Sequence, residues 1–305
     1  MDNIKKADKA RLDVVLAKQL SQARHQIQKL IKAGQVLVNG QTVTKVNHRL
    51  NADDDIKIAK AKKIITKAKL AAALPKVAVI KETDDYLVIN KPAGLMVHGA
   101  RGNSGPTLVT WLKKNYPKIA KVGEDRERPG IVHRLDKDVS GLMVIAKNNK
   151  SFNDLKRQFG ARLIYKEYQG LVYGGLKVEE GVLNFPLSRA TSGHKMAAHP
   201  AGHEGKEAVT EFKVLQHFIN YTLLSLVIKT GRTHQIRAHL SAFNHQLVGD
   251  NLYGTNITKL KNKKFNLGRV WLVSVKLAFT DLGGKKQTFK VAIPKELKEF
   301  LDTIK

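Results

Sequence analysis

The apolar residues near the N-terminus recur at the three- and four-residue spacing of an α-helix. Two sets show this spacing: Leu12, Leu16 and Leu20, followed by Ile27, Leu30 and Ile31. Next, alternating apolar and polar positions flank Asn39 and Gly40 in the stretch QVLVNGQTVT. An Asn-Gly pair tolerates the positive φ angles of a two-residue hairpin turn. The pattern therefore predicts two helices and a β-hairpin within residues 1–60.

Beyond residue 77, short apolar runs are separated by Gly, Asn and Asp. Five of these runs are typical of strands: YLVIN, GLMVIAK, YKEYQGLVY, TLLSLVIKT and VWLVSVKLAF. Helical spacing is found over residues 107–115, 151–159, 234–243 and 295–304. Strands and helices do not alternate regularly, which argues against repeated parallel βαβ units. The pattern predicts an α+β domain with a mostly antiparallel or mixed β-sheet core and flanking helices.

A lysine-rich stretch, KAKKIITKAKLAAALPK, lies between these two regions. Residues 57–69, which overlap the start of this stretch, contain six lysines and no acidic residue. Such a composition is typical of a solvated linker, and it could also contact phosphate groups. We therefore expect a small α+β domain at residues 1–60, a linker at 61–76 and a larger domain at 77–305.

The chain is strongly basic, with 54 Lys and Arg residues against 26 Asp and Glu and a formal net charge of +28. Such an excess predicts a polyanionic partner, either nucleic acid or an anionic membrane surface. Enzymes that act on nucleic acid and proteins that only bind it share this bias. The charge therefore does not decide between an enzyme and a binding protein.

The sequence contains no cysteine, which excludes disulfides, cysteine-ligated metal centres and a cysteine nucleophile. No apolar stretch approaches the roughly 20 residues that are needed to cross a bilayer. The first residues carry Asp2, Asp8 and Asp13 and no uninterrupted apolar segment, unlike a targeting peptide. We expect a soluble, cytoplasmic protein that does not associate with membranes.

The polar side of the second predicted helix is basic, with Arg24, His25, Lys29 and Lys32. A solvated surface explains such a face, and so does contact with RNA phosphates. The net charge of the chain favours RNA contact.

Two acidic residues, Asp136 and Asp138, lie among basic side chains in the stretch HRLDKDVSGL. Aspartate next to Ser-Gly favours turns, so one interpretation is structural. A metal site with His133, His234 or Asp250 is a second, although these residues lack a recognisable ligand spacing. A third is a carboxylate that an arginine keeps ionised and that acts as nucleophile or base at a sugar carbon. The spacing does not choose between Asp136 and Asp138.

The stretch KTGRTHQIRAHLSAFNHQLVGDNLYG predicts a helix that Thr233 caps at its N-terminus. Its spacing separates two faces: Ile236, Leu240 and Phe243 on an apolar one, and His234, Arg237 and Ser241 on another. In RLIYKEYQGLV, Tyr168 lies on the strand face opposite to Tyr165, where a tyrosine usually packs in a core or an interface.

Together these segments resemble a known family. RPGIVHRLDKDVSGL, RLIYKEYQGLV and GRTHQIRAHL…GDNLYG are similar to motifs of the RluA family of pseudouridine synthases, and LVINKPAGLMVH and GKEAVTEF extend the match across residues 77–305. The first 60 residues resemble the S4 RNA-binding domain over residues 11–58, as in the RluC/RluD branch. The late stretch WLVSVKLAF lacks the Leu-His-Ala that is common in that strand of the family.

The resemblance implies a role for several residues. Asp136 matches the catalytic aspartate, which attacks C1′ or abstracts the C2′ proton. Tyr168 matches the tyrosine that packs on the uracil ring, and Arg237 matches the basic partner of the aspartate. Arg134 resembles the side chain that fills the space left by a flipped nucleotide, and Arg232 is expected to contact RNA.

The resemblance also implies isomerisation of uridine to pseudouridine without a cofactor or a metal ion. Large-subunit (23S) ribosomal RNA, free or in a pre-ribosomal particle, is the expected substrate in preference to tRNA, by analogy through the S4-like head. In that head, Arg24, Lys29 and Lys32 are the expected RNA contacts. We expect a monomer. The alternatives are a non-catalytic RNA-binding ribosome-assembly factor and a metal-dependent nuclease or phosphodiesterase.

Overall fold

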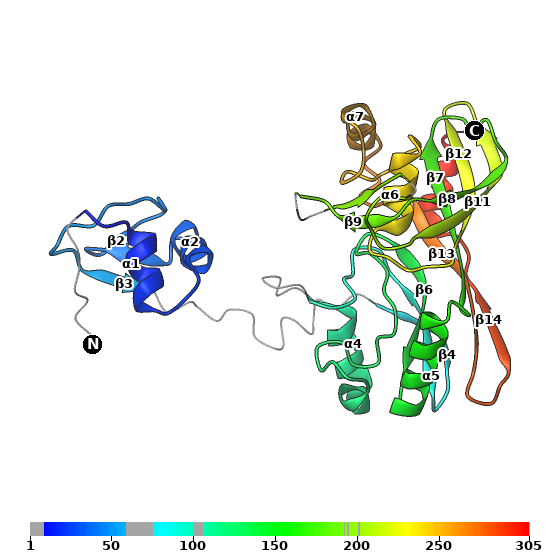
Figure 1. The fold of residues 1–305 in the computed structure, drawn as a ribbon, viewed down its shortest axis with the longest axis horizontal. Coiled ribbons are helices and arrows are strands. Elements are labelled where there is room, and N and C mark those ends of the chain that lie inside the picture. The colour runs from blue at the N-terminus through cyan, green and yellow to red at the C-terminus, as the bar shows by residue number, and fades with distance from the viewer. Residues whose placement is uncertain are drawn as a thin grey trace. The chain divides into compact units, whose positions relative to one another are not determined.

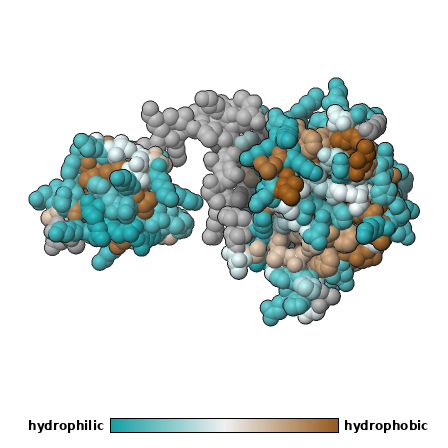
Figure 2. Space-filling model, turned by 90° about the horizontal axis from the view of Figure 1, so that it is seen from above, coloured by the Kyte–Doolittle hydropathy of each residue, from teal (hydrophilic) through white to brown (hydrophobic). Residues whose placement is uncertain are grey.

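The computed structural model describes residues 9–58, 76–99, 106–191, 193, 195–200 and 202–304. These residues form two compact units, one within residues 1–69 and the other within residues 70–305 (Figure 1). The predicted linker lies outside the described residues except for Lys76. On the face shown in Figure 2, both units expose mainly hydrophilic residues, interrupted by separate hydrophobic patches.

The N-terminal unit contains the two predicted helices and the predicted hairpin. Its elements are α1 (Leu12–Gln19), α2 (Arg24–Lys32), β1 (Val36–Val38), β2 (Gln41–Thr42) and β3 (Ile56–Ile58). The strands form an antiparallel sheet in the order β2-β1-β3. Asn39 and Gly40 adopt φ angles of 52° and 77° between the paired residues Val38 and Gln41. The unit has a hydrophobic core of its own, to which Leu12 and Ile31 contribute fully buried side chains.

The larger unit is built on one mixed sheet of nine strands. These strands are β4 (Ala78–Glu82), β5 (Tyr86–Lys91), β6 (Ser140–Ala146), β7 (Tyr165–Tyr173), β8 (Glu180–Asn184), β11 (Val209–Phe218), β12 (Tyr221–Ile228), β13 (Leu272–Thr280) and β14 (Lys286–Lys290). The order is β4-β5-β6-β13-β7-β12-β11-β8, with β14 beside β13. Only the β6–β13 pair within this sheet is parallel, so the predicted α+β class is confirmed. A separate antiparallel pair joins β9 (Leu187–Arg189) to β10 (Met196–Ala198).

The helices of the larger unit lie around this sheet. They are α4 (Leu108–Asn115), the short 3₁₀ helix η1 (Pro117–Lys121), α5 (Asn149–Gly160), α6 (Gln235–Ala242), α7 (Asn256–Phe265) and α8 (Lys295–Asp302). Helices α4 and α5 lie at one end of the unit and α6 and α7 at the other (Figure 1). The pattern missed α7, because this helix buries only Thr258 and Asn262 and has no apolar stripe. None of the helices in the described part of the chain has the length and apolar character that a membrane crossing requires.

The centre of the sheet positions the loop that contains the two aspartates. Every residue of β6 is buried, as expected for a strand that is covered on both faces. Gly141 pairs with Ser274 across the parallel β6–β13 contact, where an added Cβ would lie 2.3 Å from the Ser274 carbonyl oxygen. Strand β7 lies on the other side of β13. The loop of residues 133–139 therefore enters the sheet next to the strands that carry Tyr168 and Ser274.

Candidate active site

Asp136 lies in the loop before β6, and both its backbone and its side chain make hydrogen bonds. Its carbonyl oxygen accepts a hydrogen bond from the Val139 N–H at 3.2 Å, which closes a turn. The turn interpretation is therefore correct for the backbone. The side chain of Asp136 is only 14% exposed, and its Oδ2 accepts a hydrogen bond from Arg237 Nη1 at 3.1 Å. The side chain is thus free of turn contacts and paired with a cation.

Arg237 lies in α6 and holds two carboxylates at once. Its Nε donates to Asp250 Oδ2 at 2.7 Å and its Nη2 donates to Asp250 Oδ1 at 2.8 Å. This is the two-pronged geometry that a planar guanidinium makes with a carboxylate. The third nitrogen, Nη1, points to Asp136. Burial disfavours the charged form of Arg237, but the hydrogen bond and charge of Asp250, with those of Asp136, outweigh this effect and raise the pKa of Arg237.

Asp250 is itself held by the backbone. It is 1% exposed, and its Oδ1 also accepts the N–H groups of Leu252 and Tyr253 at 2.9 and 3.0 Å. The guanidinium of Arg237 lies 5.2 Å from the centre of the Tyr253 ring. Because Arg237 is held by Asp250 and flanked by an aromatic ring, its orientation toward Asp136 is defined before any substrate arrives.

His234 begins α6 in a left-handed conformation with φ of 54°, and it makes no side-chain cap. The prediction that Thr233 caps this helix was wrong. Instead, Gln235 Oε1 accepts hydrogen bonds from the Arg232 N–H at 3.0 Å and from the Thr230 hydroxyl at 2.7 Å, so the turn before the helix is tied by Gln235. His234 Nε2 lies 3.9 Å from Asp136 Oδ1, and burial is the main reason that the pKa of His234 is lowered.

Tyr168 is 5% exposed and lies on β7, opposite Leu226 of β12 and Ser274 of β13. Burial, and then the nearby charge of Asp136, raises the pKa of its phenol, partly offset by a hydrogen bond with the Ser274 side chain. Tyr168 and Asp136 line one small cavity of about 60 Å³. The phenol therefore stays protonated and presents a largely apolar ring beside the carboxylate.

Arg134 and Arg232 lie exposed at the edge of the same cavity. The Arg134 Nη1 is 2.9 Å from His98 Nε2, and the Arg232 Nε donates to the Glu207 carbonyl oxygen at 3.1 Å. Neither arginine is bound to a carboxylate in these contacts. The structure therefore brings together all five residues that the sequence proposed for the larger unit: Arg134, Asp136, Tyr168, Arg232 and Arg237.

The three basic residues that were proposed in the N-terminal unit are exposed on α2: Arg24, Lys29 and Lys32. Arg24 also has a structural contact, since its Nε donates to the buried Asp13 at 2.9 Å. Burial raises the pKa of Asp13, but hydrogen bonds from Arg11, Gln28 and Arg24 outweigh it and hold the pKa well below its usual range. One edge of the Arg24 guanidinium therefore fastens α2 to α1.

Sequence reasoning missed the role of Asp250 and the burial of Lys91. Asp250 was considered only as a metal ligand, although it stands in the GDNLYG motif downstream of Arg237. Lys91 is fully buried, and its ammonium donates to the carbonyl oxygens of Pro92, Leu95 and Lys137 at 2.9, 2.8 and 3.2 Å. Burial, and then the charge of Arg269, lowers the pKa of Lys91 to about 7. No local pattern marks this lysine, which is the last residue of the largely apolar strand β5.

The proposed metal ligands do not converge. His133 Nε2 accepts the Val144 N–H at 3.0 Å, and Asp250 is engaged by Arg237. In the described part of the chain, no group of three or more His, Asp or Glu side chains is arranged to hold a metal ion. The geometry instead offers one partly shielded carboxylate between an arginine and a protonated tyrosine, which suits attack or proton abstraction at a carbon centre.

Two family profiles match the chain. The profile described as RNA pseudouridylate synthase matches residues 85–242, and that of the S4 domain matches residues 10–56. An uncharacterized RNA pseudouridine synthase of Synechocystis sp. is 39% identical over 245 residues, which cover 80% of this chain and 74% of that protein. The ribosomal large subunit pseudouridine synthase D of Salmonella typhimurium is 34% identical over 306 residues, which cover 97% and 90%. The fold is similar to that of human RNA pseudouridylate synthase domain containing 1, with a TM-score of 0.59 at 21% identity over 75% of this chain and 94% of that one.

Proposed function

Because this chain belongs to the RNA pseudouridylate synthase family, we propose that it isomerises specific uridines of large-subunit (23S) ribosomal RNA. The enzyme is an RNA pseudouridine synthase with an N-terminal S4 domain. The finer substrate is supported by the Salmonella typhimurium relative, whose name specifies the large ribosomal subunit and which aligns with 97% of this chain. The net charge of +28 suits such a polyanionic substrate.

The observation that carries the proposed site is the position of Arg237 between Asp250 and Asp136. The pairing places a fixed positive charge beside the carboxylate of Asp136, and partial exclusion of water strengthens that interaction. We assign to Asp136 the catalytic step at the ribose, as nucleophile at C1′ or as base at C2′. The N-glycosidic bond breaks, the uracil rotates, a C5–C1′ bond forms, and the proton lost from C5 is balanced by one gained at N1. Substrate and product are isomers, so no co-reactant is required.

Tyr168 is assigned to the uracil ring. Its phenol stays protonated and its ring is buried beside Asp136, so it offers a flat apolar surface against which a uracil can pack. Base stacking on an aromatic side chain contributes about 1–3 kcal/mol in single-stranded nucleic acids. Such a contact holds the uracil near the carboxylate while it is detached from the ribose.

The target nucleotide has to leave its stack to reach this cavity, because C1′ is inaccessible inside a helix. Arg134 lies exposed at the edge of the cavity and is long enough to enter the space that the nucleotide vacates. Arg232, at the same edge, is assigned to a backbone phosphate. These two cations make the entrance positive while the reacting carboxylate lies further in.

The N-terminal unit is assigned to RNA affinity and the larger unit to chemistry, with the division between residues 1–60 and 77–305. The exposed amines of Lys29 and Lys32, and the exposed part of Arg24, give α2 a basic face for phosphate contacts. An S4 domain that binds RNA in this way brings the larger unit to its substrate without taking part in the reaction.

Pseudouridine mapping of total RNA from cells with and without the gene tests the proposal. We expect one or a few large-subunit positions to lose pseudouridine when the gene is removed and to regain it with the wild-type gene but not with the Asp136→Asn variant. Loss at tRNA positions alone would refute the ribosomal substrate. An unchanged map together with a defect in ribosome assembly would refute the catalytic assignment and favour a non-catalytic assembly factor.

A further inference from the structure

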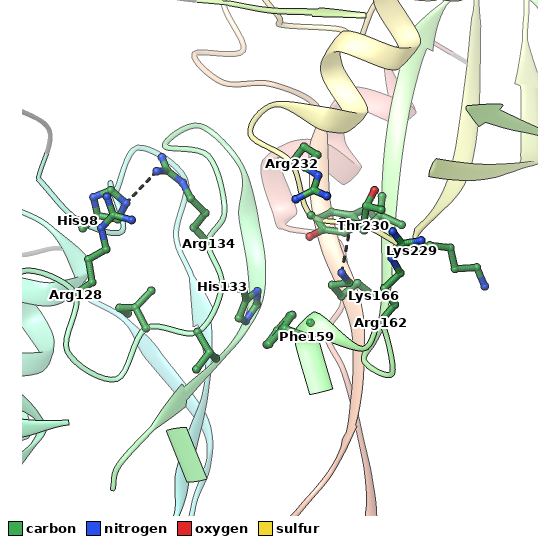
Figure 3. A pocket seen from close by; sticks show the side chains of 16 residues that line it. His98, Arg128, His133, Arg134, Phe159, Arg162, Lys166, Lys229, Thr230 and Arg232 are labelled. Carbon is green, nitrogen blue, oxygen red and sulfur yellow. Dashed lines mark hydrogen bonds between the residues drawn. The ribbon is translucent and has the colours of Figure 1, made fainter. Parts of the chain in front are cut away.

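A second cavity of about 470 Å³ lies beside the candidate active site and shares Arg134, Tyr168 and Arg232 with it. Figure 3 shows His98, Arg128 and Arg134 along one wall of this cavity, with Lys166, Thr230 and Arg232 along the other. His133 and Phe159 lie between the two walls. None of the roles proposed for the active-site residues places a part of the RNA in this larger cavity.

The lining of the cavity is cationic and contains no acidic residue. Its cations are Arg128, Arg134, Arg162, Lys166, Lys229 and Arg232. Some of these charges are compensated from outside the cavity: Arg162 binds Glu207, and Lys229 lies 3.4 Å from Glu211. Such a concave, positive surface attracts an anion.

Lys166 differs from the other cations because it is buried. It is 6% exposed, and its ammonium makes one long hydrogen bond of 3.4 Å, to the Thr230 carbonyl oxygen. The ammonium lies 5.6 Å from the centre of the Phe159 ring. In the described part of the chain, no ion pair joins Lys166 to an acidic side chain. Burial lowers the pKa of Lys166 to about 8, so the buried group still carries a proton for much of the time at neutral pH.

A buried ammonium has three donors, and burial without an anion is unfavourable. Neighbouring groups do not supply the anion, because the residues that line the cavity include no carboxylate. His133, which lies between the two walls, is neutral because burial and then the charge of Lys166 lowers its pKa to about 3. The missing counter-charge therefore has to come from a bound molecule. A phosphate group matches both the charge and the number of donors.

The register of β7 relates this cation to the active site. Lys166 and Tyr168 are two residues apart and both line the cavity, so they lie on the same strand face, roughly 6.6 Å apart along the strand. If the target uracil packs on Tyr168, a group at Lys166 belongs to the same stretch of RNA. We propose that this cavity binds a backbone phosphate of the RNA next to the target uridine, with Lys166 as its principal cation; this rests on the proposed function.

The test compares Lys166→Met with wild type and with a matched control, Lys298→Met, which removes an exposed lysine on α8. Binding to a fragment of large-subunit ribosomal RNA is titrated across a salt series, and pseudouridine formation by the wild type in the same transcript is assayed separately. Loss of one phosphate contact should make the slope of log K against log salt shallower by about 0.7. Affinity at low salt should fall about 10-fold or more, because the lost contact is charge-assisted. The slope for Lys298→Met should differ from the wild-type slope by less than half of that change.

An unchanged affinity and slope in Lys166→Met would overturn the inference, while pseudouridine formation by the wild type in the same transcript would leave the proposed function standing. Conversely, a wild type that forms no pseudouridine would refute the proposed function, and the salt slopes would still report on the cavity. A slope change as large in Lys298→Met as in Lys166→Met would also overturn the assignment, because it would reflect general loss of charge.

Thermal unfolding separates a binding role from a structural one. Lys166→Met removes a buried, uncompensated charge, so its Tm should equal or exceed that of the wild type. Replacing chloride by inorganic phosphate at constant ionic strength should raise the Tm of the wild type more than that of Lys166→Met. If the variant loses this phosphate effect but keeps full RNA affinity, the cavity binds free phosphate and the RNA proposal falls. Should Lys166→Met not fold, Lys166→Gln, which keeps a donor without the charge, takes its place in the same comparisons.

Discussion

Arg237 donates two parallel hydrogen bonds of 2.7 and 2.8 Å to Asp250, and both residues are buried. Asp250 is in turn fixed by two backbone N–H groups. The pairing leaves one guanidinium nitrogen directed at Asp136. We therefore infer that Asp250 is a positioning residue, which acts through Arg237 on Asp136, the carboxylate proposed to carry out the reaction.

Asp250→Asn tests this relationship. The asparagine amide carries no charge, and its NH2 group would face the N–H donors of Arg237. Arg237 should therefore shift, and Asp136 should lose its fixed partner. We expect single-turnover rates at saturating RNA to fall about 100-fold, as for a misplacement of about 1 Å. Removing one partner of a buried pair should also lower the free energy of unfolding by about 3–5 kcal/mol. Asp84→Asn, at an exposed position between β4 and β5, is the control and should change neither quantity. A normal rate in a destabilised Asp250→Asn protein would confine Asp250 to a structural role.

Asp136→Asn keeps the shape of the side chain but removes the nucleophile or base. We expect the rate to fall at least ~10³-fold, which corresponds to about 4 kcal/mol of activation free energy, with RNA affinity largely intact. Asp138→Asn, two residues away in the same loop, should be much milder because Asp138 is not paired with Arg237. Release of tritium from a transcript labelled at C5 of its uridines measures both, because C5 loses its hydrogen in the reaction. Near-wild-type turnover by Asp136→Asn would refute its catalytic role.

Lys91→Met should destabilise the larger unit. The substitution removes the buried ammonium group that donates to the carbonyl oxygens of Pro92, Leu95 and Lys137. We expect the free energy of unfolding to fall by about 3–5 kcal/mol. Urea denaturation at pH 7 measures the change. Lys81→Met, at an exposed position on the neighbouring strand β4, should unfold like the wild type. Equal midpoints for Lys91→Met and the wild type would contradict the structural role of this ammonium.

His133→Gln should reduce acid sensitivity. Burial, and then the charge of Lys166, lowers the pKa of His133 to about 3, below its ordinary value of 6.5. Between these values the unfolded chain binds a proton that the folded chain does not, so stability falls as pH decreases from about 6.5 toward 3. The glutamine carbonyl can still accept the Val144 N–H, and it does not titrate. From pH 6 to 4.5, the free energy of unfolding should decline less steeply in the variant than in the wild type. The two slopes should differ by up to about 1.4 kcal/mol per pH unit. Identical pH slopes would show that His133 does not resist protonation in the folded protein.

Removal of residues 1–60 should leave a folded, catalytically competent protein with weaker RNA binding. The hydrophobic core around Leu12 and Ile31 is separate from the cores of the larger unit, which contain none of its residues. Loss of about three phosphate contacts should flatten the slope of log K against log salt by roughly two units. Titration of full-length and truncated proteins with ribosomal RNA fragments measures this slope. An unchanged slope and affinity would refute the assignment of RNA contacts to α2.

Local features of the fold followed from the sequence because they depend on neighbours along the chain. The positive φ angles of Asn39 and Gly40, the strand over Tyr165–Tyr173 and the stripe of Ile236 and Leu240 each follow from the preferences of a few adjacent residues. The α7 helix was missed for the same reason, because its residues carry no apolar periodicity. The family motifs led to the proposal of Asp136 as the catalytic residue, which spacing alone could not distinguish from Asp138.

Partners that lie far apart in the chain were decided only by the tertiary structure. Asp136 and Arg237 are 101 residues apart, and Lys166 meets Thr230 across 64 residues. Nothing in the local pattern shows that Asp250 binds Arg237 or that Lys91 and Lys166 are buried. Burial and pairing depend on how β6, β13 and β7 lie side by side, and a charged side chain changes its properties only when packing removes water and brings a partner within hydrogen-bonding distance. The sequence therefore determined most of the elements and, through the family motifs, the carboxylate that we propose as the reacting group, whereas the packed sheet determined which charges surround it.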